Sequence, residues 1–303
     1  RDPGNGRHDD LLVPEIAGLE EAVGHEQVRG RTAVHHDAVL RARVGGELGF
    51  ELTGQRDLGH LLAFLEPAGG NGSFIDALSR LGAKNIEAVD LYPKHPSVQK
   101  ADFLSYEPKG RNLVTVSNPP FGRNNSLSIP FFNHAAEHSD YIACLVPRSW
   151  RKWSVQNRLD RRFHLISDQD VAVNYVTDSG QRIGTNNDLR TCFQIWEKRP
   201  DLRPKLKVED RGLVAKCTPD EADIAIRVFG FGCGKVYREF PRVANTTLMF
   251  LTVSDARVFE VIEGLDYERF TLNTSYTRAL ALPELNYLLN EAIFGDPMIR
   301  LEA

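Results

Sequence analysis

The residues best suited to chemistry form a short loop, Asn118-Pro119-Pro120-Phe121, just after a predicted strand at residues 113–116. Two prolines fix φ and remove two backbone donors, and the residue before a proline favours an extended backbone. The loop is therefore rigid and presents the Asn118 amide, the Pro119 carbonyl and the Phe121 ring. Two acceptor oxygens and an aromatic face suit a planar amide or a nucleobase amine. The alternative is a simple Asn-Pro turn, which is a common turn signal.

A glycine-rich turn lies upstream, between a predicted strand and a predicted helix. It begins with Glu66 and Pro67, has Gly70 and Gly72 at its centre and is followed by Phe74. Glycine lets the backbone approach a ligand closely and adopt positive φ. In open α/β sheets, ligands bind beyond the carboxyl ends of the strands at such turns. Many turns of this kind carry glycines for geometry alone. The glycine turn therefore predicts a ligand site only in combination with the motifs that end the neighbouring strands.

Acidic residues end the next two predicted strands. Asp90 can accept hydrogen bonds from ribose hydroxyls. Asp102 can accept from an adenine amine, and Phe103 can pack on the adenine face. Together with the glycine turn, these residues predict a ligand that contains adenosine. A pyrophosphate is disfavoured because the turn has neither dinucleotide nor P-loop spacing, and Glu66 would favour a cation such as a sulfonium with an ammonium group.

In this order the motifs resemble those of S-adenosylmethionine-dependent methyltransferases, in particular the N6-adenine class. The family pattern is acid-Pro-x-x-Gly-x-Gly-x-Phe, an acid after strand two, Asp-Phe after strand three and [DNS]-Pro-Pro-[YFW] after strand four. The chain matches it at residues 66–74, at Asp90, at Asp102-Phe103 and at residues 118–121. The resemblance covers about residues 58–198. It implies S-adenosyl-L-methionine as cofactor and a Rossmann-like seven-stranded methyltransferase sheet, mostly parallel with an antiparallel last strand.

The resemblance assigns catalysis to Asn118, Pro119, Pro120 and Phe121. The predicted activity is methyl transfer to an exocyclic amine, with adenine N6 in RNA or DNA favoured; a base inside a duplex would have to be flipped out. A protein glutamine amide and guanine N2 stay open as acceptors. Phe121 favours nucleic acid, since glutamine methylators usually carry tyrosine there. A non-catalytic methyltransferase-like binding subunit is a third possibility, although such proteins tend to lose motifs that are intact here.

A basic and aromatic stretch follows the fifth predicted strand. Such a mixture suits phosphates and unstacked bases, which predicts substrate binding. The alternative, of equal weight, is a solvated helix face with partly buried tryptophans. The polar loop at residues 174–189 is predicted to be a flap on the substrate side. The stretch contains Arg148, Trp150, Arg151, Lys152 and Trp153.

Alternating strands and helices must position these residues. This alternation predicts a parallel sheet with right-handed crossovers. Beyond the prolines near residue 200, a smaller α+β module has candidate strands at residues 224–229, 235–237 and 248–253. The predicted domains are a poorly patterned extension at 1–55, the methyltransferase domain at 56–200 and a C-terminal module at 205–303, with a possible role in substrate recognition. In the central domain the predicted strands are 61–65, 86–91, 98–103, 113–116, 141–146, 164–166 and 192–196, and the helices 74–81, 128–138 and 154–162.

The amino-acid composition excludes several classes of protein. The 303 residues are 42% hydrophobic and 26% charged, which suits a globular protein and excludes a largely disordered chain. A net charge of −4 excludes binding of nucleic acid by bulk positive charge, so a local basic patch is needed. Four cysteines without metal-ligand or redox spacing predict no metal site. With no signal region and no apolar run of bilayer length, we expect a cytoplasmic protein without a membrane partner. The oligomeric state stays open.

Overall fold

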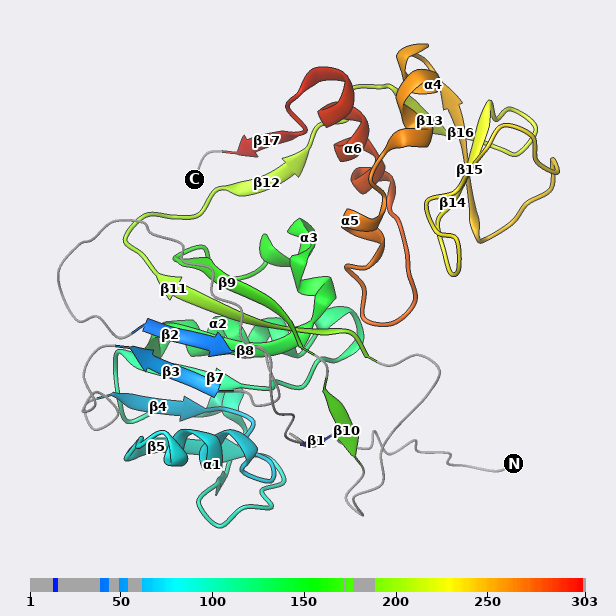
Figure 1. Cartoon of the computed structure of the whole chain (residues 1–303). Helices are drawn as coiled ribbons and strands as arrows, with labels where there is room; N and C mark the ends of the chain where they lie inside the picture. The colour runs from blue at the N-terminus through cyan, green and yellow to red at the C-terminus, as the bar shows by residue number, and fades with distance from the viewer. Residues whose placement is uncertain are drawn as a thin grey trace, which may run out of the picture. The chain divides into compact units, whose positions relative to one another are not determined.

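The computed structural model describes residues 13–15, 39–43, 49–53, 62–171, 173–176 and 189–301 (Figure 1). The chain divides into two compact units. Unit 1 comprises Arg1–Val146 and Phe163–Lys198, and unit 2 comprises Pro147–Arg162 and Arg199–Ala303. The segment Pro147–Arg162 thus groups with the C-terminal residues, whereas the sequence analysis included it in the domain at 56–200.

Two pairs of short strands belong to unit 1. Both pairs are antiparallel, and the structure describes only their backbone. The rest of the predicted extension at 1–55, and residues 177–188 of the predicted flap, also lie outside the described residues. The pairs are β1 (Val13–Glu15) with β10 (Asn174–Val176), and β2 (Val39–Arg43) with β3 (Gly49–Thr53).

A seven-stranded sheet in the order β6-β5-β4-β7-β8-β11-β9 forms the framework of unit 1. β4 pairs parallel with β5 and β7, β5 with β6, and β7 with β8. The last strand, β11, runs antiparallel to β9. This arrangement confirms the predicted seven-stranded, mostly parallel sheet. The strands are β4 (Ala63–Glu66), β5 (Asn85–Asp90), β6 (Gln99–Lys100), β7 (Leu113–Ser117), β8 (Ser139–Pro147), β9 (Phe163–Val171) and β11 (Thr191–Lys198).

The strand order reverses between β4 and β7. From β4 the chain builds outward through β5 and β6, and from β7 it builds in the opposite direction through β8. Loops that leave the carboxyl ends of two such neighbours turn to opposite sides, which opens a crevice where ligands bind in α/β sheets. In the sequence these two loops are the glycine-rich turn and the Asn-Pro-Pro-Phe motif.

Helix α1 (Ser73–Arg80) follows the glycine turn and covers the sheet. Its Phe74 and Leu78 pack in one cluster with Phe64 of β4 and Val116 of β7. These apolar residues form one face of the helix, because residues three and four apart lie on the same side. The helix predicted at residues 74–81 is confirmed except at Leu81, which lies just beyond its end and is exposed.

Helix α2 (Ser128–His138) ends at the predicted residue and buries Phe132 edge-on against Phe163 and Trp196. Ser128 is a residue type that favours the N-cap position, but in the structure it is the first helical residue, and its buried hydroxyl has no hydrogen-bond partner among the described residues.

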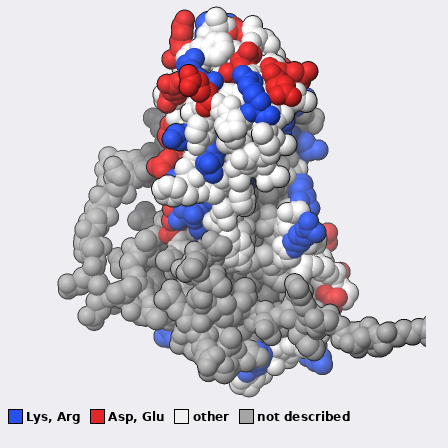
Figure 2. Space-filling model, turned by 90° about the vertical axis from the view of Figure 1, so that its right-hand side faces the viewer, with Lys and Arg blue, Asp and Glu red and all other residues white. Residues whose placement is uncertain are grey.

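Unit 2 contains a four-stranded antiparallel sheet in the order β13-β16-β14-β15 and a separate β12–β17 pair. On the face shown in Figure 2, basic and acidic side chains are interspersed. None of the helices that the structure describes combines the length and the apolar character needed to cross a bilayer. The strands are β12 (Lys205–Val208), β13 (Val214–Lys216), β14 (Ile224–Arg227), β15 (Val236–Tyr237), β16 (Leu248–Val253) and β17 (Met298–Leu301), and the helices η4 (Arg148–Arg151), α3 (Trp153–Gln156), α4 (Arg257–Val261), η5 (Ile262–Gly264), α5 (Glu268–Thr271) and α6 (Leu282–Phe294).

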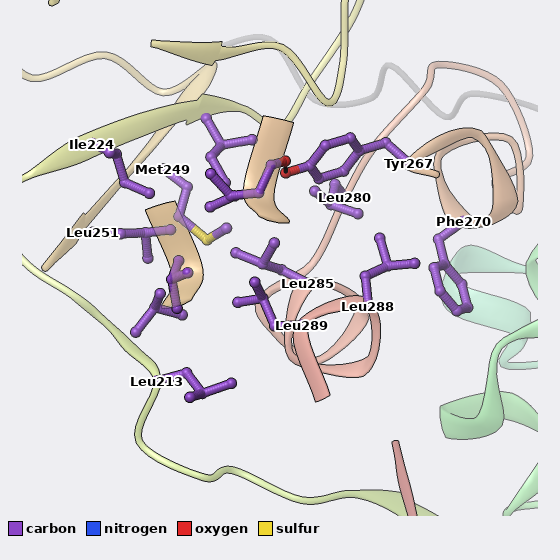
Figure 3. Packing of buried hydrophobic residues seen from close by; sticks show 14 of the residues in the cluster. Leu213, Ile224, Met249, Leu251, Tyr267, Phe270, Leu280, Leu285, Leu288 and Leu289 are labelled. Atoms are coloured by element: carbon purple, nitrogen blue, oxygen red, sulfur yellow. Dashed lines mark hydrogen bonds between the residues drawn. The ribbon is translucent and has the colours of Figure 1, made fainter. Parts of the chain in front are cut away.

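The core of unit 2 lies between its sheet and α6. Leu285 and Leu289 of α6 face Met249 and Leu251 of the sheet, and Leu288 lies beside Phe270 in the same cluster (Figure 3). Burial of this apolar stripe is the main driving force for such a helix. The helix predicted at residues 154–162 is reduced to the single turn of α3.

Candidate active site at the carboxyl ends of β4, β5 and β7

Three polar side chains share one edge of the sheet of unit 1. Glu66 is the last residue of β4, Asp90 of β5 and Ser117 of β7, and these three strands are parallel neighbours. Asn118 follows Ser117 directly. The topology therefore brings the glycine turn, the first acid and the Asn-Pro-Pro-Phe motif together, as the sequence predicted.

Glu66 connects the two loops. Its side chain is 1% exposed, and its Oε1 accepts hydrogen bonds from Ser117 Oγ at 2.7 Å and from the Ala68 N–H at 3.0 Å. Burial raises the pKa of Glu66 to about 8, and the nearby Asp90 carboxylate adds to this effect. The carboxyl is therefore mostly neutral at pH 7. No local sequence pattern indicates the role of Ser117, because its partner lies 51 residues away along the chain.

The glycine turn has the backbone that its sequence predicts. Gly70 and Gly72 have φ of 43° and 86°, a region that favours glycine. Asp90 orders this turn, since its Oδ2 accepts from the Gly70 N–H at 2.9 Å and its Oδ1 from the Tyr92 N–H at 2.7 Å. Each oxygen keeps one further lone pair for a hydroxyl. A methyl group on Gly72 would overlap the His95 ring, which packs directly against this backbone.

The residues flanking the turn are structural neighbours of the site. Pro67 is buried at the start of the turn. Phe74 points into the core under α1, where it packs with Phe64. We therefore expect any effect of Phe74 on a cofactor to act through the position of the turn.

The Asp102-Phe103 pair lies beyond β6, which is shorter than the predicted strand at 98–103. Asp102 is exposed and accepts from the Leu104 N–H at 3.1 Å, which caps the short helix η2 (Phe103–Ser105). Phe103 is buried, and its ring centroid lies 5.2 Å from that of Phe131 and 4.8 Å from that of His134. In this structure the Phe103 ring packs against α2, and stacking on adenine stays a prediction.

The Asn-Pro-Pro-Phe motif joins β7 to the first turn of α2. The Phe121 carbonyl accepts from the backbone N–H groups of Leu127 at 3.3 Å and of Ser128 at 3.4 Å. Pro119 is buried, and Pro120 and Phe121 are half-buried. These contacts hold the loop rigidly at the start of the helix.

The Asn118 amide is the most informative feature of the motif. Its Oδ1 is buried and has no hydrogen-bond partner in the described part of the chain. A buried acceptor without a donor costs about 1–3 kcal/mol, and most buried polar atoms in proteins are hydrogen-bonded. The Asn118 oxygen therefore has an unused capacity to accept a hydrogen bond.

Comparison with known proteins agrees with this chemistry. No protein-family model matches the chain. Two curated relatives do match: the type II methyltransferases M.HincII and M.HindII of Haemophilus influenzae are 33% identical over 69 residues, or 22% of this chain. The chain resembles S-adenosylmethionine-dependent methyltransferases. The match spans only 14% and 13% of the two relatives' own lengths.

Solved methyltransferase structures are also similar to this chain. A putative RNA methyltransferase from Pyrococcus horikoshii gives a TM-score of 0.36 at 16% identity, covering 48% of this chain and 79% of that one. The 23S rRNA methyltransferase ErmE gives 0.31 at 15% identity, covering 46% and 63%. The strand order of this chain is established by its own strand pairing.

The predicted substrate-binding stretch lies in unit 2, where it is largely occupied by internal contacts. Trp150 is fully buried. Lys152 Nζ lies 2.9 Å from Oε1 of Glu284, which is also buried. These contacts favour the second interpretation of the stretch, in which its aromatic residues are partly buried. Arg148 and Arg151 are half-buried, and their predicted role is not tested by these contacts.

Trp153 has an equally clear structural role. Its ring stacks on Tyr287 of α6, with centroids 5.7 Å apart and planes 17° apart, and meets Phe270 edge-on at 5.5 Å. It also packs against the core of unit 2. A ring that stacks on a tyrosine inside the unit offers less surface to a base.

One group of possible metal ligands occurs among the described residues, His134, Glu137 and His138, with ligand atoms within 4.8 Å of one another. Arg111 Nη1 donates to Nδ1 of His138 at 2.8 Å. This bond places the ring proton of a neutral His138 on Nε2, and burial lowers its pKa and keeps it neutral. Nε2 would have to lose that proton to bind a metal, so the arrangement does not suit a metal centre.

Proposed function

We propose that this chain transfers a methyl group from S-adenosyl-L-methionine to an exocyclic amine, with adenine N6 in RNA or DNA as the favoured acceptor. The observation that carries the proposal is the buried, unpartnered Oδ1 of Asn118 at the point where the strand order reverses. An amine is the kind of donor that this oxygen lacks. The Ser117–Glu66 hydrogen bond joins this acceptor to the predicted cofactor turn.

The residues at the carboxyl edge fit the proposed cofactor. Gly70 and Gly72 keep the backbone bare where a ligand would approach, and Asp90 keeps lone pairs for ribose hydroxyls. Glu66 becomes anionic when its proton leaves, which would balance a cationic ligand. No side chain of this set needs to bind a pyrophosphate.

The proposed chemistry depends on positioning. When bound, S-adenosylmethionine supplies an electrophilic methyl group on a sulfonium. The lone pair of an exocyclic amine is delocalised into the base, so the amine is a poor nucleophile. Asn118 Oδ1 and the Pro119 carbonyl would accept its two hydrogens, which favours a tetrahedral nitrogen whose lone pair faces the methyl group. Phe121, which is half-buried, would stack on the base.

The same proposal includes a nucleic-acid partner and a cytoplasmic site of action. Phe121 supports a base rather than a glutamine amide as the acceptor, because glutamine methylators usually carry tyrosine there. All four cysteines are free thiols, which fits a reducing compartment. Guanine N2, a protein amide and a non-catalytic binding role are the competing outcomes of the test below.

Asn118→Ala tests the proposal. We expect transfer of a tritiated methyl group to fall at least about 100-fold, in line with the loss of one preorganised polar contact at a reacting group. Cofactor affinity measured by calorimetry should stay close to that of the wild-type protein. Asn85→Ala, at an exposed position at the start of β5, is the matched control.

Assays on separate RNA, DNA and protein fractions, followed by nucleoside and amino-acid analysis, identify the acceptor. Labelled N6-methyladenosine in RNA or its deoxy form in DNA supports the proposal. Turnover that is unchanged in Asn118→Ala would contradict it, as would cofactor binding without transfer to any fraction.

A further inference from the structure

A β-hairpin of unit 2 exposes an aromatic tip on an ordered backbone. Its strands, β14 and β15, are joined by residues 228–235. Two backbone bonds close the base, from the Arg227 N–H to the Lys235 carbonyl at 2.9 Å and from the Gly234 N–H to the Arg227 carbonyl at 2.7 Å. The three glycines of the connection all have positive φ, which only glycine adopts freely: Gly230 (80°), Gly232 (72°) and Gly234 (98°).

Phe231 stands at this tip. Its side chain is 99% exposed, and that of Phe229 is 50% exposed. By contrast, the aromatic rings of Trp153 and Phe270 pack into the core of unit 2. The backbone on either side of Phe231 is bonded within the tip, since the Cys233 N–H donates to the Gly230 carbonyl at 3.2 Å. The ring is therefore held in water by a shaped loop rather than by a frayed end.

A neighbouring segment supports the tip from the side. The Gly230 N–H donates to the Arg278 carbonyl at 3.0 Å, and Phe229 forms a β-bridge with Ala279. Tyr276, two residues before Arg278, is 46% exposed. Exposed aromatic side chains thus come from two segments that lie side by side.

Positive charge accompanies this tip. Residues 227–238 contain three basic residues and no acid. One of them, Arg238, is paired with Glu263. Among the described residues, the side chains of Arg227 and Lys235 at the base of the hairpin form no ion pair with an acid. Arg227 Nε donates to the Tyr237 hydroxyl at 3.4 Å, and Lys235 Nζ lies 5.2 Å from the centroid of the Tyr237 ring. Two cations without acidic partners therefore flank an exposed ring.

We propose that this hairpin is a nucleic-acid contact in which Phe231 stacks on an unpaired base while Arg227 and Lys235 bind the adjacent phosphates. Stacking needs an open aromatic face, and phosphates need cations that are not already neutralised. Both conditions are met here and not at Trp153 and Lys152, which are engaged inside unit 2. The inference rests on the proposed nucleic-acid substrate and adds which surface of the chain holds it.

Fluorescence anisotropy with the full chain tests the stacking. The probes are labelled 30-nucleotide single strands of DNA and of RNA and a 30-base-pair duplex, all of the same sequence. We expect Phe231→Ala to weaken binding to the single strands about 5- to 150-fold, as for loss of one aromatic stacking contact. Phe231→Trp should restore affinity. Leu202→Ala, also in unit 2 and 47% exposed, should leave it unchanged.

The salt dependence tests the charges. In Arg227→Gln and in Lys235→Gln, the slope of log K against log salt on single strands should decrease by about 0.7 for each cation removed. Unchanged slopes, or equal affinity of Phe231→Ala and wild type for every probe, would overturn the inference. Absence of oligonucleotide binding, or Phe231-dependent binding of a protein fraction instead, would overturn it as well.

The test separates this inference from the proposed function. Phe231-dependent oligonucleotide binding without methyl transfer would leave the hairpin contact standing and remove the proposed activity. Normal binding and methyl transfer in Phe231→Ala would retain the activity and remove the hairpin contact.

Discussion

Glu66→Gln replaces a buried carboxyl with a neutral group of the same shape. Glutamine keeps an Oε1 that can accept from Ser117 Oγ and from the Ala68 N–H, which lie 2.7 and 3.0 Å from that atom in the structure. Its amide takes the place of the protonated second oxygen. We expect the variant to fold and to change how stability depends on pH.

The raised pKa of Glu66 decides whether the free energy of unfolding rises or falls with pH. Burial raises the pKa of Glu66 from 4.5 to about 8. Below pH 4.5 both the folded and the unfolded chain hold the proton. Between pH 4.5 and about 8 only the folded chain keeps it, so the free energy of unfolding decreases as the pH rises. Above about pH 8 the free energy of unfolding is lower than below pH 4.5 by about 5 kcal/mol, at about 1.4 kcal/mol per pKa unit.

Urea unfolding without cofactor at pH 5 and pH 9 measures the effect. Relative to wild type, Glu66→Gln should gain about 4 kcal/mol in unfolding free energy between these two pH values. Glu239→Gln, at an exposed position, is the control and should show no such gain. A gain for Glu66→Gln below about 0.5 kcal/mol would refute the assignment of a neutral, buried carboxyl, since surface substitutions stay within that range.

The same variant reports on the cofactor. A bound cation near Glu66 favours the ionised carboxyl, so binding should release a proton below pH 8 and tighten as the pH rises from 6 to 8. Calorimetry in two buffers of different ionisation enthalpy detects the released proton. In Glu66→Gln the proton release and the pH dependence should both disappear. Their persistence would show that another group titrates.

Two further substitutions test the roles that packing assigns. Gly72→Ala should destabilise the chain by about 1–3 kcal/mol in urea unfolding, because its φ of 86° disfavours a side chain and the methyl group would overlap His95. Gly82 has a φ of 91° and open space around it, so Gly82→Ala measures the cost of the backbone conformation alone. This variant should lose less unfolding free energy than Gly72→Ala. Trp153→Ala should cost about 3 kcal/mol through loss of its stack on Tyr287. If it instead weakened oligonucleotide binding at unchanged stability, the predicted substrate role of Trp153 would be restored.

Local patterns determined much of the architecture. The strand predicted at residues 248–253 has these bounds in the structure, and the helix predicted to run to about residue 138 ends there. The order of the glycine turn, Asp90 and the Asn-Pro-Pro-Phe motif predicted that they share one edge of a parallel sheet. Such inferences succeed because apolar spacing, glycine and proline act on the backbone within a few residues of themselves.

The sequence by itself therefore determined the fold class, the edge where the site lies and the groups that could do chemistry there. Only the tertiary structure decided what each group touches. Glu66 is neutral because its burial in the core raises its pKa to about 8, although the hydrogen bond from Ser117, 51 residues away along the chain, favours the charged form. Trp153 stacks on Tyr287 rather than on a base, and Phe231 rather than Trp153 is open to solvent. The type of a residue limits the contacts that its side chain can make. The pKa, burial and bonding partner of that side chain depend on neighbours that are remote in sequence.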